Sequence, residues 1–230
     1  MPPMTEPAAS ADLMPSLARL VRGLSALFWG LPIALVVCVQ TAKTDFFGAF
    51  GIVPPVLTTG LLWYAVRQMA HFRRQERVWR SALDRAQAVA LINLGLAPFL
   101  YWGKILPTVG HYQLATWTMA VSGLFFLVLV NQALQRLTAM LPDETLRLEA
   151  GFFTTLNLYL LLGVLFLLSL WLVLLQVKPL PAALLPVLAL FSVVGLMLLL
   201  LLVLLPLALT MTLLWRIKET ILKSVFAART

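Results

Sequence analysis

The sequence predicts an all-α fold: a polytopic transmembrane helical bundle with six spans and both termini in the cytoplasm. The first reason is composition, since 61% of the 230 residues are hydrophobic and only 11% are charged, whereas a soluble domain has roughly 25% charged residues. The second reason is that long uncharged segments separate the clusters of charged residues. The third is that segments rich in lysine and arginine alternate with poor ones, as is typical of multi-pass membrane proteins.

Six uncharged segments are long enough to cross a membrane. In chain order they contain 20, 21, 18, 31, 28 and 37 residues, and a helix needs roughly 20 apolar residues to cross a hydrocarbon core of about 30 Å. The last segment is interpreted as one long helix, because a turn inside the membrane would leave backbone polar groups without hydrogen bonds. We therefore predict spans at residues 24–42, 46–66, 86–106, 112–135, 150–177 and 182–215.

The distribution of positive charge predicts the orientation of these spans. With the N-terminus inside, the inner segments hold 14 lysine and arginine residues and the outer loops hold 3. Lysine and arginine concentrate in cytoplasmic loops, so both termini are predicted to be cytoplasmic. In a bacterium, the protein would lie in the inner membrane.

The N-terminal part is expected to be a loose cytoplasmic tail followed by a closely packed helix. Residues 1–15 are rich in proline, alanine and small polar residues, which disfavours a stable fold, so the first helix is expected to begin near Ser16. Ala26, Gly30 and Ala34 follow at intervals of four residues. Small residues at this spacing share one helix face and predict a close contact with another helix, in this chain or in a partner.

Prolines mark the expected beginnings and bends of later helices. Pro54 and Pro55 lie near the outer end of the second span, where proline is compatible with a first helical turn. Pro98 and Pro206 lie inside the third and sixth spans, and proline inside a helix predicts a kink.

An acidic pair is expected to begin the fifth helix. Pro142 fits a first turn, and the carboxylates of Asp143 and Glu144 are stabilised by the helix dipole at that position. The alternative is a metal site or a catalytic pair, but adjacent helical residues point to different sides, so the helix start is the preferred interpretation.

The most basic part of the chain is residues 67–85, which hold six arginines. The apolar residues of this segment and the alanine that follows it fall close to one helical face: Met69, Phe72, Trp79, Leu83 and Ala86. Arg80 is four residues from both Glu76 and Asp84, a spacing typical of helical ion pairs. We therefore predict a basic amphipathic helix on the cytoplasmic membrane surface.

The C-terminal tail, residues 217–230, repeats this pattern. Its apolar residues and the end of the last span share one face: Leu214, Ile217, Ile221, Leu222 and Val225. Basic residues near the inner surface attract anionic head groups. We therefore expect contacts with anionic lipids or with a partner protein from Arg73, Arg74, Arg77, Arg80, Lys218 and Lys223. A nucleic-acid partner is not expected, because no aromatic platform or recognisable module accompanies the charge.

Little in the sequence indicates catalysis, a metal or a cofactor. All nine acidic residues lie outside the uncharged segments, whereas proton and ion paths usually carry ionisable residues inside the membrane. His71 and His111 are predicted to lie on opposite sides of the membrane, and Cys38 is the single cysteine. The sequence contains no hydrolase, nucleotide-binding or zinc-protease motif. We therefore expect no cofactor, no metal site and no enzymatic activity.

Uncharged polar residues in the spans are the remaining candidates for a binding site. Those predicted to lie toward the cytoplasmic side are Asn93, Asn131, Gln132, Thr154, Thr155 and Asn157. One interpretation is a polar pocket, formed mainly by the four amides, that binds an uncharged or lipid-like ligand. The other is hydrogen bonding between helices, which is common in membrane proteins.

Two functions remain open on the sequence alone. The first is a non-catalytic membrane subunit or scaffold, whose helices pack on other membrane proteins and whose basic segments contact lipid or a cytoplasmic partner. The second is a binding or permease component for an uncharged or lipid-like small molecule, held by the inner amides near Gly95 and Pro98. Stoichiometric partners would favour the first function, and loss of uptake on replacing Asn93 and Asn157 with leucine would favour the second.

Overall fold

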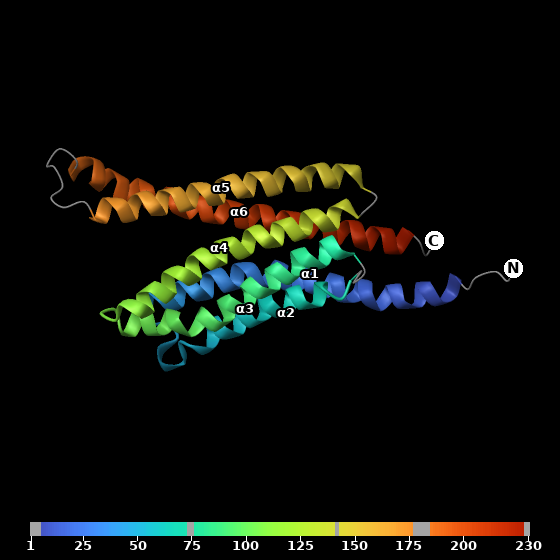
Figure 1. The fold of residues 1–230 in the computed structure, drawn as a ribbon, viewed down its shortest axis with the longest axis horizontal. Helices are drawn as coiled ribbons and strands as arrows, with labels where there is room; N and C mark the ends of the chain where they lie inside the picture. Colours follow the sequence, from blue (N-terminus) through green and yellow to red (C-terminus); the bar gives the residue numbers. More distant parts are fainter. Residues whose placement is uncertain (1–5, 73–75, 141–142, 177–184, 228–230) are drawn as a thin grey trace.

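The computed structural model describes residues 6–72, 76–140, 143–176 and 185–227, and these fold into six α-helices and one short 3-10 turn (Figure 1). In chain order they are α1 (Glu6–Lys43), η1 (Gly48–Phe50), α2 (Val53–Met69), α3 (Arg77–Ile105), α4 (Gly110–Ala139), α5 (Glu144–Gln176) and α6 (Leu185–Ala227). No β-strand occurs in these ranges. The predicted all-α fold is confirmed.

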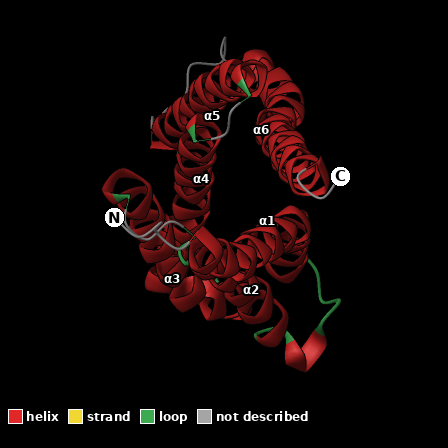
Figure 2. Ribbon diagram, turned by 90° about the vertical axis from the view of Figure 1, so that its right-hand side faces the viewer, coloured by secondary structure: helices red, strands yellow, loops and turns green. Residues whose placement is uncertain are grey.

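Successive helices run in opposite directions along the long axis of the bundle (Figure 1). α1 begins and α6 ends at the same end, which we call the terminal end, and the α1–α2 and α3–α4 connections lie at the opposite end. Each helix packs against the next one in the chain, and α6 returns to pack against α1. Figure 2, which views the bundle from the terminal end, shows the resulting closed order of helices.

Within the described residues, five of the six helices are long and apolar enough to cross a membrane. Their candidate spans are Pro15–Lys43, Arg77–Ile105, Gly110–Ala139, Glu144–Leu167 and Leu201–Lys223. The exception is α2, whose 17 residues extend about 26 Å at a rise of 1.5 Å per residue. The chain is a multi-pass helical membrane protein.

α2 begins later than expected, at Val53 rather than at residue 46. The residues before it form η1 instead, where the N–H of Gly48 donates to the carbonyl of Asp45 at 2.9 Å. Gly48 has a φ of 48°, a left-handed conformation that glycine adopts without strain. This turn shortens the second helix and places part of the predicted span in the α1–α2 connection.

The prolines lie where the sequence predicts them within helices. Pro54 and Pro55 occupy the first turn of α2, which confirms their predicted place in a first helical turn although the helix begins later than residue 46. Pro98 and Pro206 lie inside α3 and α6, and both helices continue past them.

The basic segment 67–85 is not one continuous helix, contrary to the prediction. α2 ends at Met69 and α3 begins at Arg77, and the indole Nε1 of Trp79 donates a hydrogen bond of 3.0 Å to the carbonyl of Phe72 in the turn between them. The turn lets Met69 and Trp79 enter the same core. In a single helix they would be about 15 Å apart along the axis.

Both ends of the chain extend as helix at the terminal end (Figure 1). α1 begins at Glu6, so the segment expected to be a loose tail is helical from that residue onward. α6 continues to Ala227, so the described part of the tail 217–230 is the end of the last helix rather than a separate surface helix.

The main core lies toward the terminal end and receives side chains from every helix. Each helix contributes at least one almost fully buried side chain to it. From α1 to α6, examples are Leu20, Val66, Trp79, Leu134, Leu146 and Ile217. A second, smaller cluster of Ala97, Leu100 and Met119 joins α3 and α4 toward the opposite end.

The close helix contact predicted for the first span is formed between α1 and α2. A Cβ added at Gly30 would lie 3.0 Å from Leu62, and Ala34 is buried, so the predicted stripe is confirmed at these two positions. The closest approach is at Gly23, which the prediction did not include. A Cβ there would lie 2.8 Å from the carbonyl oxygen of Ala65.

Candidate functional site

A cluster of buried amide and hydroxyl groups joins three helices. It consists of Asn131 in α4, Asn157 in α5 and Thr210 in α6, which are 1%, 1% and 0% exposed. The Nδ2 groups of Asn131 and Asn157 both donate hydrogen bonds to Thr210 Oγ1, at 2.8 and 3.2 Å. We call these three residues the amide–hydroxyl cluster.

Thr210 is the centre of this cluster because its hydroxyl bonds in three directions. Besides accepting from both amides, it donates to the carbonyl of Pro206 at 2.7 Å. A hydroxyl has one donor hydrogen and two acceptor lone pairs, so this group is fully used. Asn131 Nδ2 also donates to the carbonyl of Leu127 at 2.9 Å. Helices α4, α5 and α6 are thus connected through a single oxygen atom.

The amide oxygens of the cluster are the unsatisfied groups. Asn131 Oδ1 and Asn157 Oδ1 are buried and receive no hydrogen bond from the part of the chain that the structure describes. A buried acceptor without a partner destabilises a structure by roughly 1–3 kcal/mol, and such groups usually bind water or a ligand. The cluster holds no titratable side chain, so its chemistry is hydrogen bonding rather than proton transfer.

The structure brings together two of the four amides predicted to bind a ligand. Asn131 and Asn157 meet in the cluster, whereas Asn93 in α3 is buried but makes no hydrogen bond to either of them. Gln132 is exposed on the outer surface of α4. Thr210 was not predicted, and the only sequence signal for it was a hydroxyl within an otherwise apolar span.

The two predicted threonines bond mainly to their own helix. Thr154 Oγ1 donates to the carbonyl of Ala150 at 2.7 Å and lies 3.5 Å from the carbonyl of Asn131. Thr155 Oγ1 donates to the carbonyl of Gly151 at 3.0 Å. Neither hydroxyl reaches the amide oxygens of the cluster.

The predicted lipid-contact residues that the structure describes lie at the surface, but the apolar faces beside them are covered by protein. Arg77 and Arg80 are exposed at the start of α3. On the buried face of the same helix, Trp79 and Leu83 lie in the core and are each 1% exposed. Arg73 and Arg74 lie outside the described residues. The predicted surface helix is therefore the first part of α3, with its apolar face packed in the bundle.

The end of α6 shows the same arrangement. Ile217 and Ile221 are 0% and 1% exposed, and the chain packs them against the bundle rather than against lipid. Lys218 lies over the ring of Trp215 at 5.8 Å. Lys223 is exposed and forms an ion pair with Glu219 at 2.8 Å. The basic side chains are accessible, but they do not belong to membrane-surface amphipathic helices.

A charged hollow of about 190 Å³ lies at the terminal end, between the start of α5 and the last turns of α6. It is lined by Asp143, Thr145, Leu146, Glu149, Arg216, Glu219, Thr220 and Lys223. Arg216 pairs with Glu149, as Lys223 does with Glu219. Paired charges attract an additional charged ligand only weakly.

Asp143 caps α5, in agreement with the predicted helix start. Its Oδ1 accepts hydrogen bonds from the hydroxyl of Thr145 at 2.7 Å and from the N–H groups of Thr145 and Leu146 at 3.1 and 3.2 Å. The Thr145 hydroxyl, followed by the Leu146 N–H, lowers the pKa of Asp143 below its ordinary value. Within the described ranges, no three histidine, cysteine or acidic side chains gather as metal ligands would.

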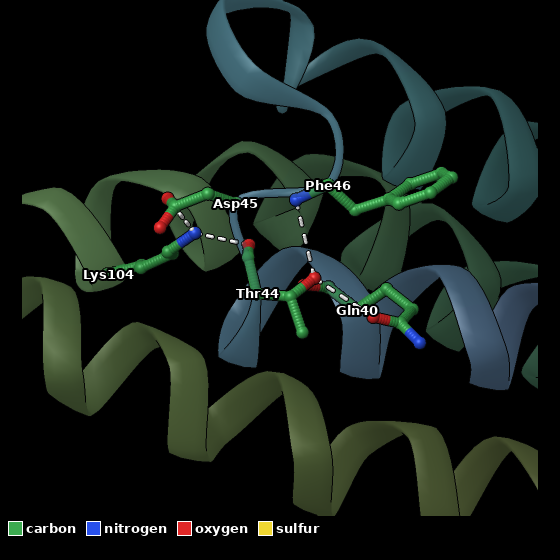
Figure 3. A network of polar contacts seen from close by, with 5 residues as sticks. All are labelled: Gln40, Thr44, Asp45, Phe46 and Lys104. Atoms are coloured by element: carbon green, nitrogen blue, oxygen red, sulfur yellow. Dashed lines mark hydrogen bonds and ion pairs between the residues drawn. The ribbon is translucent and has the colours of Figure 1, made fainter.

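The α1–α2 connection at the opposite end is attached to α3 at two points. Lys104 Nζ donates to the carbonyl of Thr44 and pairs with the carboxylate of Asp45 (Figure 3). Gly51 lies so close to the ring of Tyr101 that a Cβ at this position would overlap it. These contacts fix the connection against the outer part of α3.

The fold and the site define a helical membrane bundle with a buried polar contact between three helices. Comparison of the chain with protein families, with curated proteins and with solved structures finds no match.

Proposed function

We propose that the chain crosses the membrane six times with both termini in the cytoplasm, in the inner membrane if the protein is bacterial. The common position of the α1 start and the α6 end (Figure 1) supports an even number of crossings, with α2 as the short one. The positive-inside rule supports a cytoplasmic terminal end, which carries Arg19, Arg22, Arg67, Arg77, Arg80, Arg136, Arg147, Arg216, Lys218 and Lys223.

We propose that the protein is a non-catalytic subunit or scaffold of a membrane complex. The observation that carries this proposal is that the buried amides of Asn131 and Asn157 donate to Thr210 across three helices. Such hydrogen bonds hold helices together, with roughly 0.6 kcal/mol per pair in membrane proteins. The exposed basic side chains at the terminal end then provide the contact surface for anionic head groups or a cytoplasmic partner.

Purification of the tagged protein from its native membrane, in native lipid discs, tests this proposal. We expect defined proteins to copurify in fixed ratio, as measured by quantitative mass spectrometry. Charge reversal of the exposed Arg77 and Arg80 should release a partner bound at the terminal end, while the matched Lys43→Glu change at the opposite end should not. A chain that purifies alone as a stable monomer with one enriched small molecule would contradict the subunit proposal.

The second candidate function is binding or transport of an uncharged or lipid-like molecule. It is supported by the two buried amide oxygens that lack a donor, Asn131 Oδ1 and Asn157 Oδ1. Replacing either residue with leucine should abolish binding or uptake of the copurified molecule. Gln132→Leu is the matched control, because this amide is on the same helix as Asn131 but exposed. Unchanged binding in the Asn131 and Asn157 variants would eliminate this function.

A further inference from the structure

Two phenylalanines at the opposite end of the bundle are among the most exposed apolar side chains. Phe46 is 80% exposed and Phe50 is 76% exposed. A phenyl ring in water loses the stabilisation that burial provides, so two such rings in one short connection require an explanation. Figure 3 shows the Phe46 ring pointing away from the Asp45–Lys104 pair. Both rings face surroundings outside the chain.

Contacts with α3 fix the height of this connection along the bundle. Thr44 and Asp45 are held at the level of Lys104, and Gly51 lies against the ring of Tyr101, almost one turn deeper in α3. Tyrosine and tryptophan side chains at the ends of membrane helices lie at the level of the lipid head groups. The connection therefore lies beside the end of α3 rather than beyond it.

The exposed phenylalanines precede an exposed apolar stripe along α2. The stripe consists of Val53, Leu57, Leu61 and Tyr64, which are 48%, 66%, 36% and 39% exposed. α2 has 17 residues, about 26 Å of helix, whereas the hydrocarbon core is about 30 Å thick. The helix is thus too short to reach both surfaces of the bilayer unless the bilayer thins locally, and the adjoining connection lies at the end where the helix falls short.

The backbone of the connection is suited to a place with little water. The N–H groups of Gly48, Phe50 and Gly51 donate to carbonyl groups within the connection, at 2.9, 3.1 and 3.2 Å. The N–H of Phe46 donates to the hydroxyl of Thr44 at 3.4 Å. Unpaired backbone groups are strongly unfavourable in lipid, and these four local hydrogen bonds reduce that obstacle.

We propose that residues 44–52 lie within the outer interface of the lipid bilayer, with Phe46 and Phe50 inserted among the upper acyl chains and the Asp45–Lys104 pair at the level of the head groups. The occupant is phospholipid, because the two rings extend the surface of α2 that lipid covers. This inference rests on the proposed crossing of the membrane by α2. In this arrangement, the connection completes the crossing that the short helix leaves unfinished.

Site-directed spin labelling in phospholipid vesicles tests the proposal. Phe46→Cys and Phe50→Cys are made in a Cys38→Ala background, because Cys38 is the single cysteine, and both sites are exposed enough to accept a label without disturbing the fold. Leu57→Cys on α2 is the lipid control, and Thr108→Cys in the α3–α4 connection, which is polar and exposed, is the water control. The measurement is accessibility to oxygen, which concentrates in lipid, against accessibility to a water-soluble nickel chelate.

We expect the labels at positions 46 and 50 to resemble the label at position 57, with oxygen accessibility dominant. The label at position 108 should favour the nickel chelate. Nickel accessibility at position 46 or 50, with position 57 still in lipid, would overturn the proposal and make the connection a water-exposed aromatic surface for a protein partner. Nickel accessibility at position 57 itself would overturn the crossing by α2, so failure of the topology and failure of the anchor are distinguishable.

Discussion

The two ends of the bundle are held together by different interactions. Toward the terminal end, the helices share one core of large apolar side chains such as Trp79 and Ile217. Toward the opposite end, the described residues form only a small cluster around Leu100 and Met119. There, polar contacts such as that of Lys104 attach the α1–α2 connection to α3.

The larger size of the core at the terminal end is related to the charged residues near it. Leu20 stands between Arg19 and Arg22 in the sequence, and Ile217 lies next to Arg216. In the proposed topology, with spans at residues 24–42 and 182–215, this part of the core would extend beyond the hydrocarbon. Near water, apolar burial is driven by the hydrophobic effect. Inside lipid that force is absent between helices, and packing and hydrogen bonds hold them together. In that topology, the long helices form their largest core where the hydrophobic effect stabilises it.

Trp79→Ala should give the largest loss of stability. Trp79 is 1% exposed and its Nε1 bonds to the carbonyl of Phe72, so the variant loses packing and leaves a cavity in the terminal core. We expect a loss of about 3–5 kcal/mol, measured as the free energy of unfolding in lipid discs or detergent. Trp29→Ala is the matched control, because Trp29 is 63% exposed. Equal losses in both variants would remove the distinction between core and lipid-facing positions.

Gly23→Ala tests the closest approach of α1 and α2. The new Cβ would lie 2.8 Å from the backbone oxygen of Ala65, and a backbone atom yields only if the helices separate. We expect a loss of about 1–3 kcal/mol from overpacking. Gly95→Ala is the control, since a Cβ there meets nothing within 4 Å, and the higher helix propensity of alanine should raise stability by roughly 0.5–1 kcal/mol. A loss of stability in Gly23→Ala together with a gain in Gly95→Ala would support the close contact between α1 and α2. An unchanged stability in Gly23→Ala would contradict it.

Thr210→Val probes the polar contact inside the membrane. Valine keeps the shape but removes the oxygen that accepts from Asn131 and Asn157. With two bonds of roughly 0.6 kcal/mol each, the loss should be about 1 kcal/mol, smaller than that of Trp79→Ala. Thr212→Val should change little, because its exposed hydroxyl donates to Ala208 in its own helix. A double-mutant cycle with Asn131→Leu measures the coupling, and zero coupling would mean that the bond does not stabilise the bundle.

The sequence was sufficient to predict the class of fold and several local features. Hydropathy and charge spacing predict membrane helices because lipid permits little other structure, and Asp143 caps α5 through a local hydrogen bond. Those features depend on neighbours in sequence. The pairing of Gly23 with Ala65 depends on how two helices meet and needed the structure.

The amphipathic faces at the terminal end show a limit of sequence reasoning. The apolar stripe containing Trp79 and Leu83 was found correctly, but it was assigned to lipid, whereas other helices cover it. Periodicity identifies a buried face without identifying what buries it. For the same reason, Asn131 and Asn157 were predicted while their partner Thr210 was not.

Asp143→Asn should give the smallest effect, confined to acid conditions at the terminal end. Hydrogen bonds from Thr145 and Leu146 lower the pKa of Asp143 in the folded protein below the ordinary value of 3.8, so the carboxylate stabilises the fold above that pH. This contribution should decline as the pH falls from 3.8 through the folded pKa, because the protonated acid caps the helix less well. Unfolding measured across this range should depend less on pH in Asp143→Asn than in the parent protein. Glu144→Gln, which removes the neighbouring charge but keeps the cap, should retain that dependence. If both variants behave alike, the general charge at the helix start, rather than the Asp143 hydrogen bonds, controls the response to acid.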